Sequence, residues 1–218
     1  MKIQVKNVSK SFKEVEILNN INLEFNNGKI YGLIGKNGSG KSVLLKMLCG
    51  FYKPTTGTIK FDNHDIIKEG VFAPNTRALI ENPSFLPDLT GYENLETLAN
   101  IQKKITKEDI EKTLKDVNLY EAKDKKYRTY SLGMKQKLGL AQVFMEDPEL
   151  IILDEPFRGI EESTVDKIRK LLLELKKKNK IILIATHDKE DLEKLADIVY
   201  KFENNTIQII DVKKKINK

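Results

Sequence analysis

Apolar residues recur along the chain with two different periods, which predict alternating strands and helices. Residues 2–6 and 16–25 alternate between apolar and polar positions, as half-buried strands do. The continuous apolar runs 30–34, 150–153 and 181–185 have the length and boundaries of strands that are buried on both faces. Further short strands are expected at 58–61, 76–80, 198–200 and 207–210. These patterns predict an α/β fold with a mostly parallel central sheet and an N-terminal antiparallel β subdomain.

Helical spacing of apolar residues is found both between the predicted strands and in one longer block. Helices between strands are expected at 43–49, 161–178 and 189–196. The block 89–146 shows three helical patterns with no strand between them, and these begin at Gly91, Thr106 and Ser131. We therefore interpret 89–146 as an inserted α-helical subdomain. Segments 1–88 and 147–218 would then form the α/β core of a single domain.

Composition narrows the class of protein without identifying it. The chain has 218 residues, of which 40% are hydrophobic and 32% charged, and a net charge of +6. This charge is too small to favour a nucleic-acid partner over an ordinary solvated surface. The one cysteine, Cys49, lies in an apolar segment and cannot form an internal disulfide, which suits the cytoplasm. No apolar run reaches the roughly 20 residues that span a bilayer, so a role at a membrane would require a partner with the spans.

The segment 35–42 fits a phosphate-binding loop, in which a glycine and four further residues precede Gly-Lys-Ser. A predicted strand precedes it and a predicted helix follows it, which is the context that the pattern requires. Its backbone N–H groups and the positive end of the new helix would attract a phosphate. Lys41 would reach the β- and γ-phosphates, and the Ser42 hydroxyl would bind Mg²⁺. The expected nucleotide contacts here are Gly35, Lys36, Asn37, Gly38, Ser39, Gly40, Lys41, Ser42 and Val43.

Two more polar groups directly follow buried strands, at the sheet edge where ligands bind in α/β proteins. Asp154 and Glu155 end the apolar run 150–153, and His187 follows 181–185. Acidic groups at the end of an apolar strand need a partner, and a Mg²⁺–nucleotide complex would provide one. Asp154 would hold the metal, and Glu155 would act as general base on a water molecule. The candidate catalytic residues are Lys41, Glu155 and His187. His187 would contact the γ-phosphate.

One further segment resembles a family motif. The signature motif of the ATP-binding-cassette (ABC) family is usually written LSGGQ, and the similar segment here is Tyr130-Ser131-Leu132-Gly133-Met134-Lys135-Gln136. Ser131 and Gly133 match that pattern, whereas Tyr130, Leu132 and Met134 differ. This form resembles the ATPase subunits of bacitracin- and lantibiotic-type peptide exporters. The resemblance covers essentially the whole chain, with the motifs in the family's order.

The resemblance implies roles for residues that the spacing alone does not assign. Phe12 stands where the family stacks an aromatic ring on adenine, and Glu81 where most members have a glutamine that contacts Mg²⁺. It also implies a head-to-tail dimer that binds ATP, in which the signature residues contact ATP held by the other subunit. These contacts would come from Ser131, Leu132, Gly133 and Met134. The implied activity is hydrolysis of ATP, which would power a separate transmembrane permease subunit. The permease would export antimicrobial peptides or drugs, and it would hold this chain at the inner, cytoplasmic face of the cell membrane.

Several alternatives remain open from the sequence. Glu81, Met134 and Glu161 differ from the family pattern, which also fits a low-turnover regulatory subunit or a dimer with a different ATPase subunit. A soluble ABC-type ATPase that acts on ribosomes or nucleic acid is the rival class. Phe12 suits either a core contact or a base platform. The segment 83–88, with Phe85 and Leu86, would either cover the core or line a groove for a membrane partner.

Overall fold

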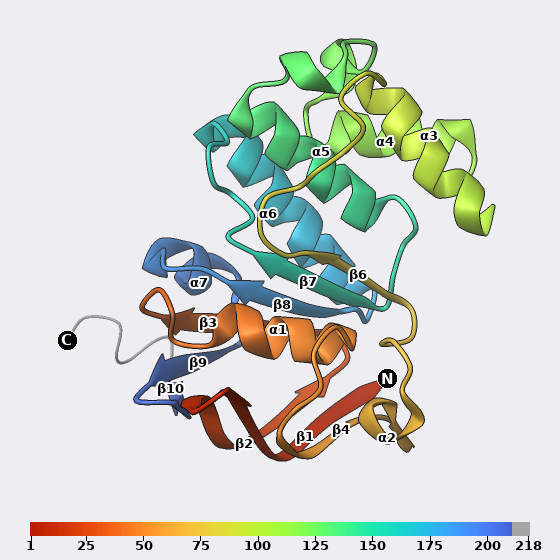
Figure 1. Cartoon of the computed structure of the whole chain (residues 1–218). Coiled ribbons are helices and arrows are strands. Elements are labelled where there is room, and N and C mark those ends of the chain that lie inside the picture. The colour runs from red at the N-terminus through yellow and green to blue at the C-terminus, as the bar shows by residue number, and fades with distance from the viewer. Residues whose placement is uncertain (211–218) are drawn as a thin grey trace.

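The central sheet places the ends of its parallel strands at one edge (Figure 1). The structure is a computed structural model that describes residues 1–210. The strand order is β10-β9-β3-β8-β7-β6, in which β10 pairs antiparallel to β9 and the other neighbouring strands pair in parallel. Its strands are β3 (Lys29–Gly35), β6 (Thr76–Leu79), β7 (Leu150–Asp154), β8 (Ile181–Ala185), β9 (Ile198–Glu203) and β10 (Thr206–Ile210). The α/β class and the mostly parallel sheet are as the apolar runs predict.

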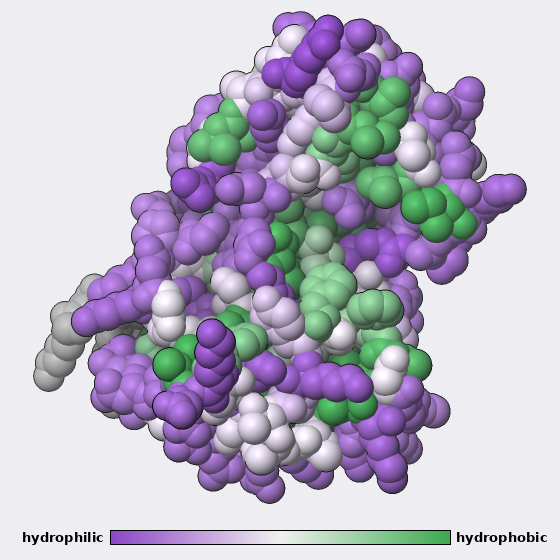
Figure 2. All heavy atoms as spheres, viewed as in Figure 1, coloured by the Kyte–Doolittle hydropathy of each residue, from purple (hydrophilic) through white to green (hydrophobic). Residues whose placement is uncertain are grey.

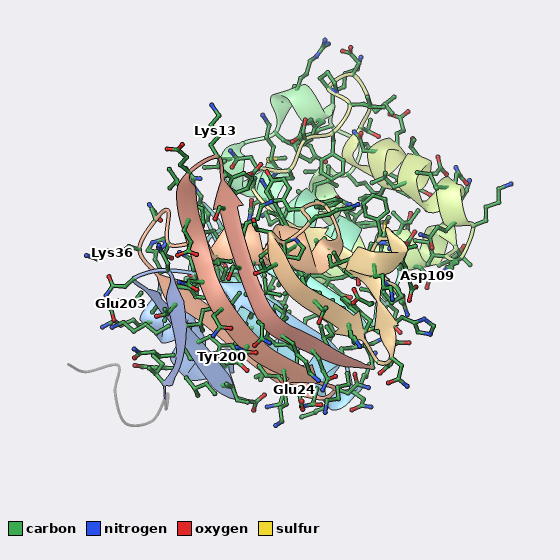
Figure 3. All side chains as sticks on the ribbon, turned by 60° about the horizontal axis from the view of Figure 1, so that its bottom comes forward. Lys13, Glu24, Lys36, Asp109, Tyr200 and Glu203 are labelled. Carbon is green, nitrogen blue, oxygen red and sulfur yellow. The ribbon has the colours of Figure 1, made fainter. Side chains whose placement is uncertain are left out.

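A second, antiparallel sheet lies below the first in Figure 1 and comes forward in Figure 3. Its order is β2-β1-β4-β5, from β1 (Lys2–Phe12), β2 (Val15–Asn26), β4 (Thr56–Phe61) and β5 (His64–Asp65). Tyr200 on β9 joins the two sheets, because its hydroxyl donates to the backbone oxygen of Glu24 at 3.3 Å (Figure 3). The strand expected at 2–6 is longer in the structure. It continues along β2 as far as Phe12, which is the last residue of β1.

The helices lie around the central sheet. They are α1 (Lys41–Cys49), α2 (Ile66–Glu69), α3 (Gly91–Gln102), α4 (Lys107–Asp116), α5 (Leu132–Phe144), α6 (Glu162–Lys177) and α7 (Lys189–Leu195), with 3-10 turns at Tyr120–Ala122 and Tyr127–Thr129. Figure 1 shows α3, α4 and α5 together at the top, with α1 between the two sheets. Capping boxes begin α3 at Thr90 and α4 at Thr106, which satisfies N–H groups that the helix itself leaves unpaired.

The core has two parts because side chains alternate across the central sheet. Leu150 and Ile152 of β7 pack with α1 and the antiparallel sheet. Ile151 and Leu153 point to the other face and pack with α5 and α6. Cys49, at the end of α1, is buried in the first part, and burial raises the pKa of its thiol to about 12. Among the described residues, no helix combines the length and apolar character needed to cross a bilayer.

Candidate active site

A cavity of about 610 Å³ opens beside the phosphate loop, at the carboxyl edge of the central sheet. Segments far apart in the sequence meet there, which brings together most of the residues predicted to contact a nucleotide. The cavity is lined by Phe12, Ile17, Asn37, Gly38, Ser39, Gly40, Lys41, Ser42, Val43, Glu81, Asn82, Gln136, Asp154, Glu155 and Arg158. Gly35, Lys36 and His187 line a neighbouring cavity of about 880 Å³ instead, which shares Asn37, Gly38 and Ser39 with the first.

The phosphate loop connects the end of β3 to the start of α1 through a left-handed turn. Gly40 caps the helix with φ of 99°, a left-handed conformation that strains any residue with a side chain. A Cβ atom there would also lie 2.7 Å from the end of the Leu18 side chain, which would have to move. The Lys41 ammonium group turns back into the loop and donates to the backbone oxygens of Gly35 at 2.7 Å and Lys36 at 3.1 Å. The Ser39 hydroxyl is buried without a hydrogen-bond partner. A loop that gathers donors in this way is suited to an anion.

Ser42 and Asp154 form an oxygen pair at the base of the cavity. The Ser42 hydroxyl donates to Asp154 Oδ2 at 2.5 Å, and the Asp154 residue is buried. Burial raises the pKa of Asp154, and burial likewise lowers the pKa of Lys41. A hydroxyl and a carboxylate are ligands that Mg²⁺ accepts. Within residues 1–210 no cluster of three or more acidic, histidine or cysteine side chains can hold a metal. The pair therefore fits a Mg²⁺ ion that takes its other ligands from phosphates and water.

Glu155 and His187 meet at the ends of adjacent strands. His187 Nδ1 lies 2.9 Å from Glu155 Oε1, and the Thr186 hydroxyl lies 3.5 Å from Glu155 Oε2. The strand register brings them together, because β7 and β8 pair in parallel with Asp154 opposite Ala185. Glu155 has a left-handed backbone with φ of 48°, which turns its side chain away from the strand direction. The His187 side chain is 77% exposed, so it is accessible to a ligand.

Glu81 and Phe12 reach the cavity from the sides, and each has a partner that the sequence analysis did not assign. Lys46, one turn after Ser42 on α1, forms an ion pair with Glu81, and this hydrogen bond raises the pKa of Lys46. Phe12 is 41% exposed and packs edge-on against Tyr52, with ring centroids 5.5 Å apart. Phe12 is thus a half-exposed apolar surface at the cavity, not a core residue.

Ser131–Met134 of the signature segment do not line this cavity, whereas Gln136 of the same segment does. Ser131 caps α5, since its hydroxyl accepts from the Met134 N–H at 3.2 Å, and Leu132 is exposed. Gly133 approaches the chain after β7 so closely that an added Cβ would lie 2.2 Å from the Gly159 carbonyl oxygen. The N-terminal end of α5 therefore remains on the surface, available to a ligand held elsewhere.

Five residues at or beside the cavity were not predicted from the sequence, namely Ile17, Lys46, Asn82, Gln136 and Arg158. Gln136 is buried on α5 and its amide donates to the backbone oxygens of Glu155 at 3.0 Å and Pro156 at 3.1 Å. It thereby holds the turn that carries the candidate base. A polar residue on the buried side of an apolar helix is the signal that would have found it. Lys46 carries no comparable signal, because its place depends on its ion pair with Glu81, 35 positions away. Arg158 lies three residues after Glu155, and no sequence pattern marks it.

Comparisons with known proteins agree with this geometry. Residues 18–158 match the family described as ABC transporter. The chain is 40% identical over 200 residues to the bacitracin transport ATP-binding protein BcrA of Enterococcus faecalis, covering 90% of this chain and 65% of BcrA. It is 32% identical over 197 residues to the lantibiotic transport ATP-binding protein SrtF of Streptococcus pyogenes, covering 90% and 85% of the two chains.

A solved structure supports the fold. The post-hydrolysis dimer of the ATP-binding cassette MJ0796, bound to ADP and phosphate, superposes with a TM-score of 0.87 at 23% identity, covering 96% of this chain and 98% of that one. The resemblance expected from the signature segment is confirmed by the family match and by both relatives. The chain therefore belongs to the ABC transporter family.

Proposed function

We propose that this chain binds and hydrolyses ATP as the motor subunit of a transporter whose membrane-spanning part is a separate permease. The observation that carries the proposal is the convergence, in one cavity, of the phosphate loop with the Ser42–Asp154 pair and with Glu155. A binding module without hydrolysis would not need a carboxylate positioned next to that pair.

The described contacts suggest how each residue acts. Lys41 would exchange its loop carbonyl partners for the β- and γ-phosphates, and the Phe12 ring would stack on adenine. When bound by Ser42 and Asp154, with Glu81 nearby, Mg²⁺ would neutralise charge on the phosphates. Glu155 would take a proton from the water that attacks the γ-phosphorus while the bond to the ADP oxygen breaks, giving ADP and phosphate.

We propose a head-to-tail dimer in which Ser131–Met134 of one subunit completes the site of the other. The supporting observation is that the helix end behind these residues is exposed and lies outside the cavity of its own chain. Such an end offers N–H groups and a positive dipole to a γ-phosphate supplied from across an interface. The MJ0796 cassette, which has the same fold, is a dimer.

An exposed apolar surface supports the proposed permease partner. Phe51 and Phe72 are 60% and 68% exposed, their rings lie 5.8 Å apart edge-on, and Val71 is exposed beside them. Figure 2 shows apolar atoms on the side of the molecule where α2 lies in Figure 1. Leu86 is exposed as well, whereas Phe85 packs against Tyr127. We propose that the segment 83–88, between the core and a helical subdomain at 89–146, contributes Leu86 to the permease contact.

The names of two relatives support a proposal for the substrate class. The printed names of BcrA and SrtF assign them to bacitracin and lantibiotic transport. The chain spans 65% of the length of BcrA. We propose export of an antimicrobial peptide or drug, with this chain held at the inner face of the cell membrane by the permease.

ATP turnover by the purified chain is the first test. Release of phosphate should depend on Mg²⁺ and should fall to background in Glu155→Gln, which keeps the size of the side chain but removes the base. Turnover in Glu155→Gln equal to that of the unchanged chain would contradict the mechanism. Isolation of the tagged chain from detergent-solubilised membranes should yield a polytopic membrane protein in stoichiometric amount, whereas ribosomal proteins instead would contradict the permease proposal.

A further inference from the structure

Arg169 is a buried arginine at the centre of α6 that takes no part in the mechanism described above. Its guanidinium group faces three carboxylates. Nε and Nη2 donate to Asp191 Oδ1 at 3.0 and 2.6 Å, and Nη1 donates to Glu162 at 2.6 Å and to Asp166 at 2.8 Å. The same group lies 5.6 Å from the centre of the Phe157 ring. Every polar edge of the side chain is therefore engaged.

The partners of Arg169 belong to the segments that carry the candidate catalytic groups. Asp191 is in the first turn of α7, which begins two residues after His187. Phe157 follows Glu155 by two residues. Arg169 thus links the turn after β8 to the turn after β7, where His187 Nδ1 and Glu155 Oε1 lie 2.9 Å apart.

A third segment reaches the signature helix. Glu162 directly follows Glu161, whose carboxylate accepts from Lys137 Nζ on α5 at 3.0 Å. Three hydrogen-bonded steps therefore connect α5, the start of α6 and the start of α7. Lys137 is buried on the helix whose exposed end carries Ser131.

The Arg169–Asp191 contact is suited to fixing a position. Asp191 is 3% exposed, and Arg169 binds its Oδ1 through two nitrogens of one rigid, planar group. A buried pair of this kind adds little net stability compared with an apolar replacement, but loss of one partner leaves a charge without compensation. Its main effect is to define the place of α7 relative to α6.

We propose that Arg169 is a positioning residue, which holds the turn of His187 against the turn of Glu155 so that the two side chains meet. This inference rests on the proposed hydrolysis of ATP, since it concerns the same site. The chain offers a way to observe the position of His187 directly, because it contains only two histidines, His64 and His187. His64 lies on β5 of the antiparallel sheet and serves as an internal reference.

The test compares Asp191→Asn and Arg169→Lys with Glu190→Gln. In Asp191→Asn, Arg169 keeps two carboxylate partners, so the buried positive charge remains compensated and folding should be retained. Arg169→Lys keeps the positive charge, but an ammonium group cannot bind Asp191 and Glu162 at once as the planar guanidinium group does. Glu190→Gln removes an exposed ion pair with Lys194 on the same helix and is the matched control.

The readouts are imidazole NMR, nucleotide affinity and turnover. We expect the His187 signals to move in both test variants while those of His64 stay in place. ATP affinity should stay within about twofold, while turnover should fall by roughly tenfold or more, since small displacements of a catalytic group cost rate. Unchanged His187 signals, or an equal effect in Glu190→Gln, would overturn the proposal. If the unchanged chain showed no turnover, the proposed function would fail, and the NMR comparison would still decide the role of Arg169.

Discussion

Replacement of Asp154 by asparagine should make the nucleotide-free chain more stable and the chain with Mg²⁺ and ATP less stable than the unchanged one. Asp154 ends β7 as a buried residue, and burial raises the pKa of its carboxyl group above the ordinary aspartate value. The folded state therefore disfavours the ionised form. The folded chain therefore loses stability as the pH rises from the pKa of Asp154 in the unfolded chain through its higher pKa in the folded chain. At pH values above both of these pKa values, the destabilisation is complete.

The size of the effect follows from the contacts. Asparagine keeps an oxygen that can accept from the Ser42 hydroxyl, so the hydrogen bond remains and only the buried charge is removed. Burial of a polar group without full compensation costs about 1–3 kcal/mol, and we take about 1 kcal/mol because Ser42 compensates in part. For a chain of this length, that corresponds to a rise in melting temperature of about 2–4 °C. ATP with Mg²⁺ at a hundred times its dissociation constant should stabilise the unchanged chain by about 2.7 kcal/mol.

Thermal unfolding followed by circular dichroism would check both the predicted gain in stability without nucleotide and the predicted loss with Mg²⁺ and ATP. Melting curves of Asp154→Asn and the unchanged chain are compared without nucleotide, with ATP and Mg²⁺, and with ATP and a chelator. The exposed Asp88, which pairs with Arg128, provides a control, and Asp88→Asn should change stability by no more than about 0.5 kcal/mol. The advantage of Asp154→Asn without nucleotide should shrink toward low pH. A lower melting temperature without nucleotide, or undiminished stabilisation by Mg²⁺, would refute the reasoning.

Three further predictions concern stability. Gly133→Ala should lower the free energy of unfolding, measured in urea, by about 1–3 kcal/mol, because the new methyl group would meet the Gly159 carbonyl oxygen. A decrease in the free energy of unfolding below about 0.5 kcal/mol would contradict this packing. Arg77→Met should cost roughly 3–5 kcal/mol in the same measurement, because Glu146 has a buried side chain that pairs with Arg77. The pKa of Glu161 is lowered to about 2, chiefly by a hydrogen bond from its own backbone N–H. Its ionised form therefore stabilises the folded chain at pH values above the ordinary pKa of a glutamate, and this stabilisation is lost as the pH falls toward 2. Glu161→Gln should lack that part of the acid dependence, as a pH series of melting curves would show.

Periodicity predicts the parts of this fold that depend on local sequence. The strands at 150–153 and 181–185 consist of apolar residues alone, and burial on both faces of a sheet is the arrangement that accommodates such runs. The phosphate loop is equally local, since its glycines and the following lysine specify one short turn. By contrast, α2 has only four residues, too few for a helical period to be visible.

The remaining features depend on which segments meet in space. Lys46 and Glu81 are 35 positions apart, and nothing in the sequence around either residue points to the other. Their ion pair follows only from the packing of α1 against the segment after β6. Gln136 is recognisable as a buried polar residue, but its partners become known only when α5 lies on the turn after β7. The expected strand at 2–6 ends before Phe12, because polar residues between 6 and 11 hide the continuation of β1.

The burial of Cys49 has a practical consequence for labelling chemistry. It is the only thiol of the chain, it lies inside the core at the end of α1, and its pKa of about 12 keeps it in the unreactive protonated form. The natural sequence therefore serves as a background that maleimide reagents leave unmodified. A cysteine introduced at the exposed Leu132 would be the single attachment point for a fluorophore or spin label, with no need to replace a native residue first.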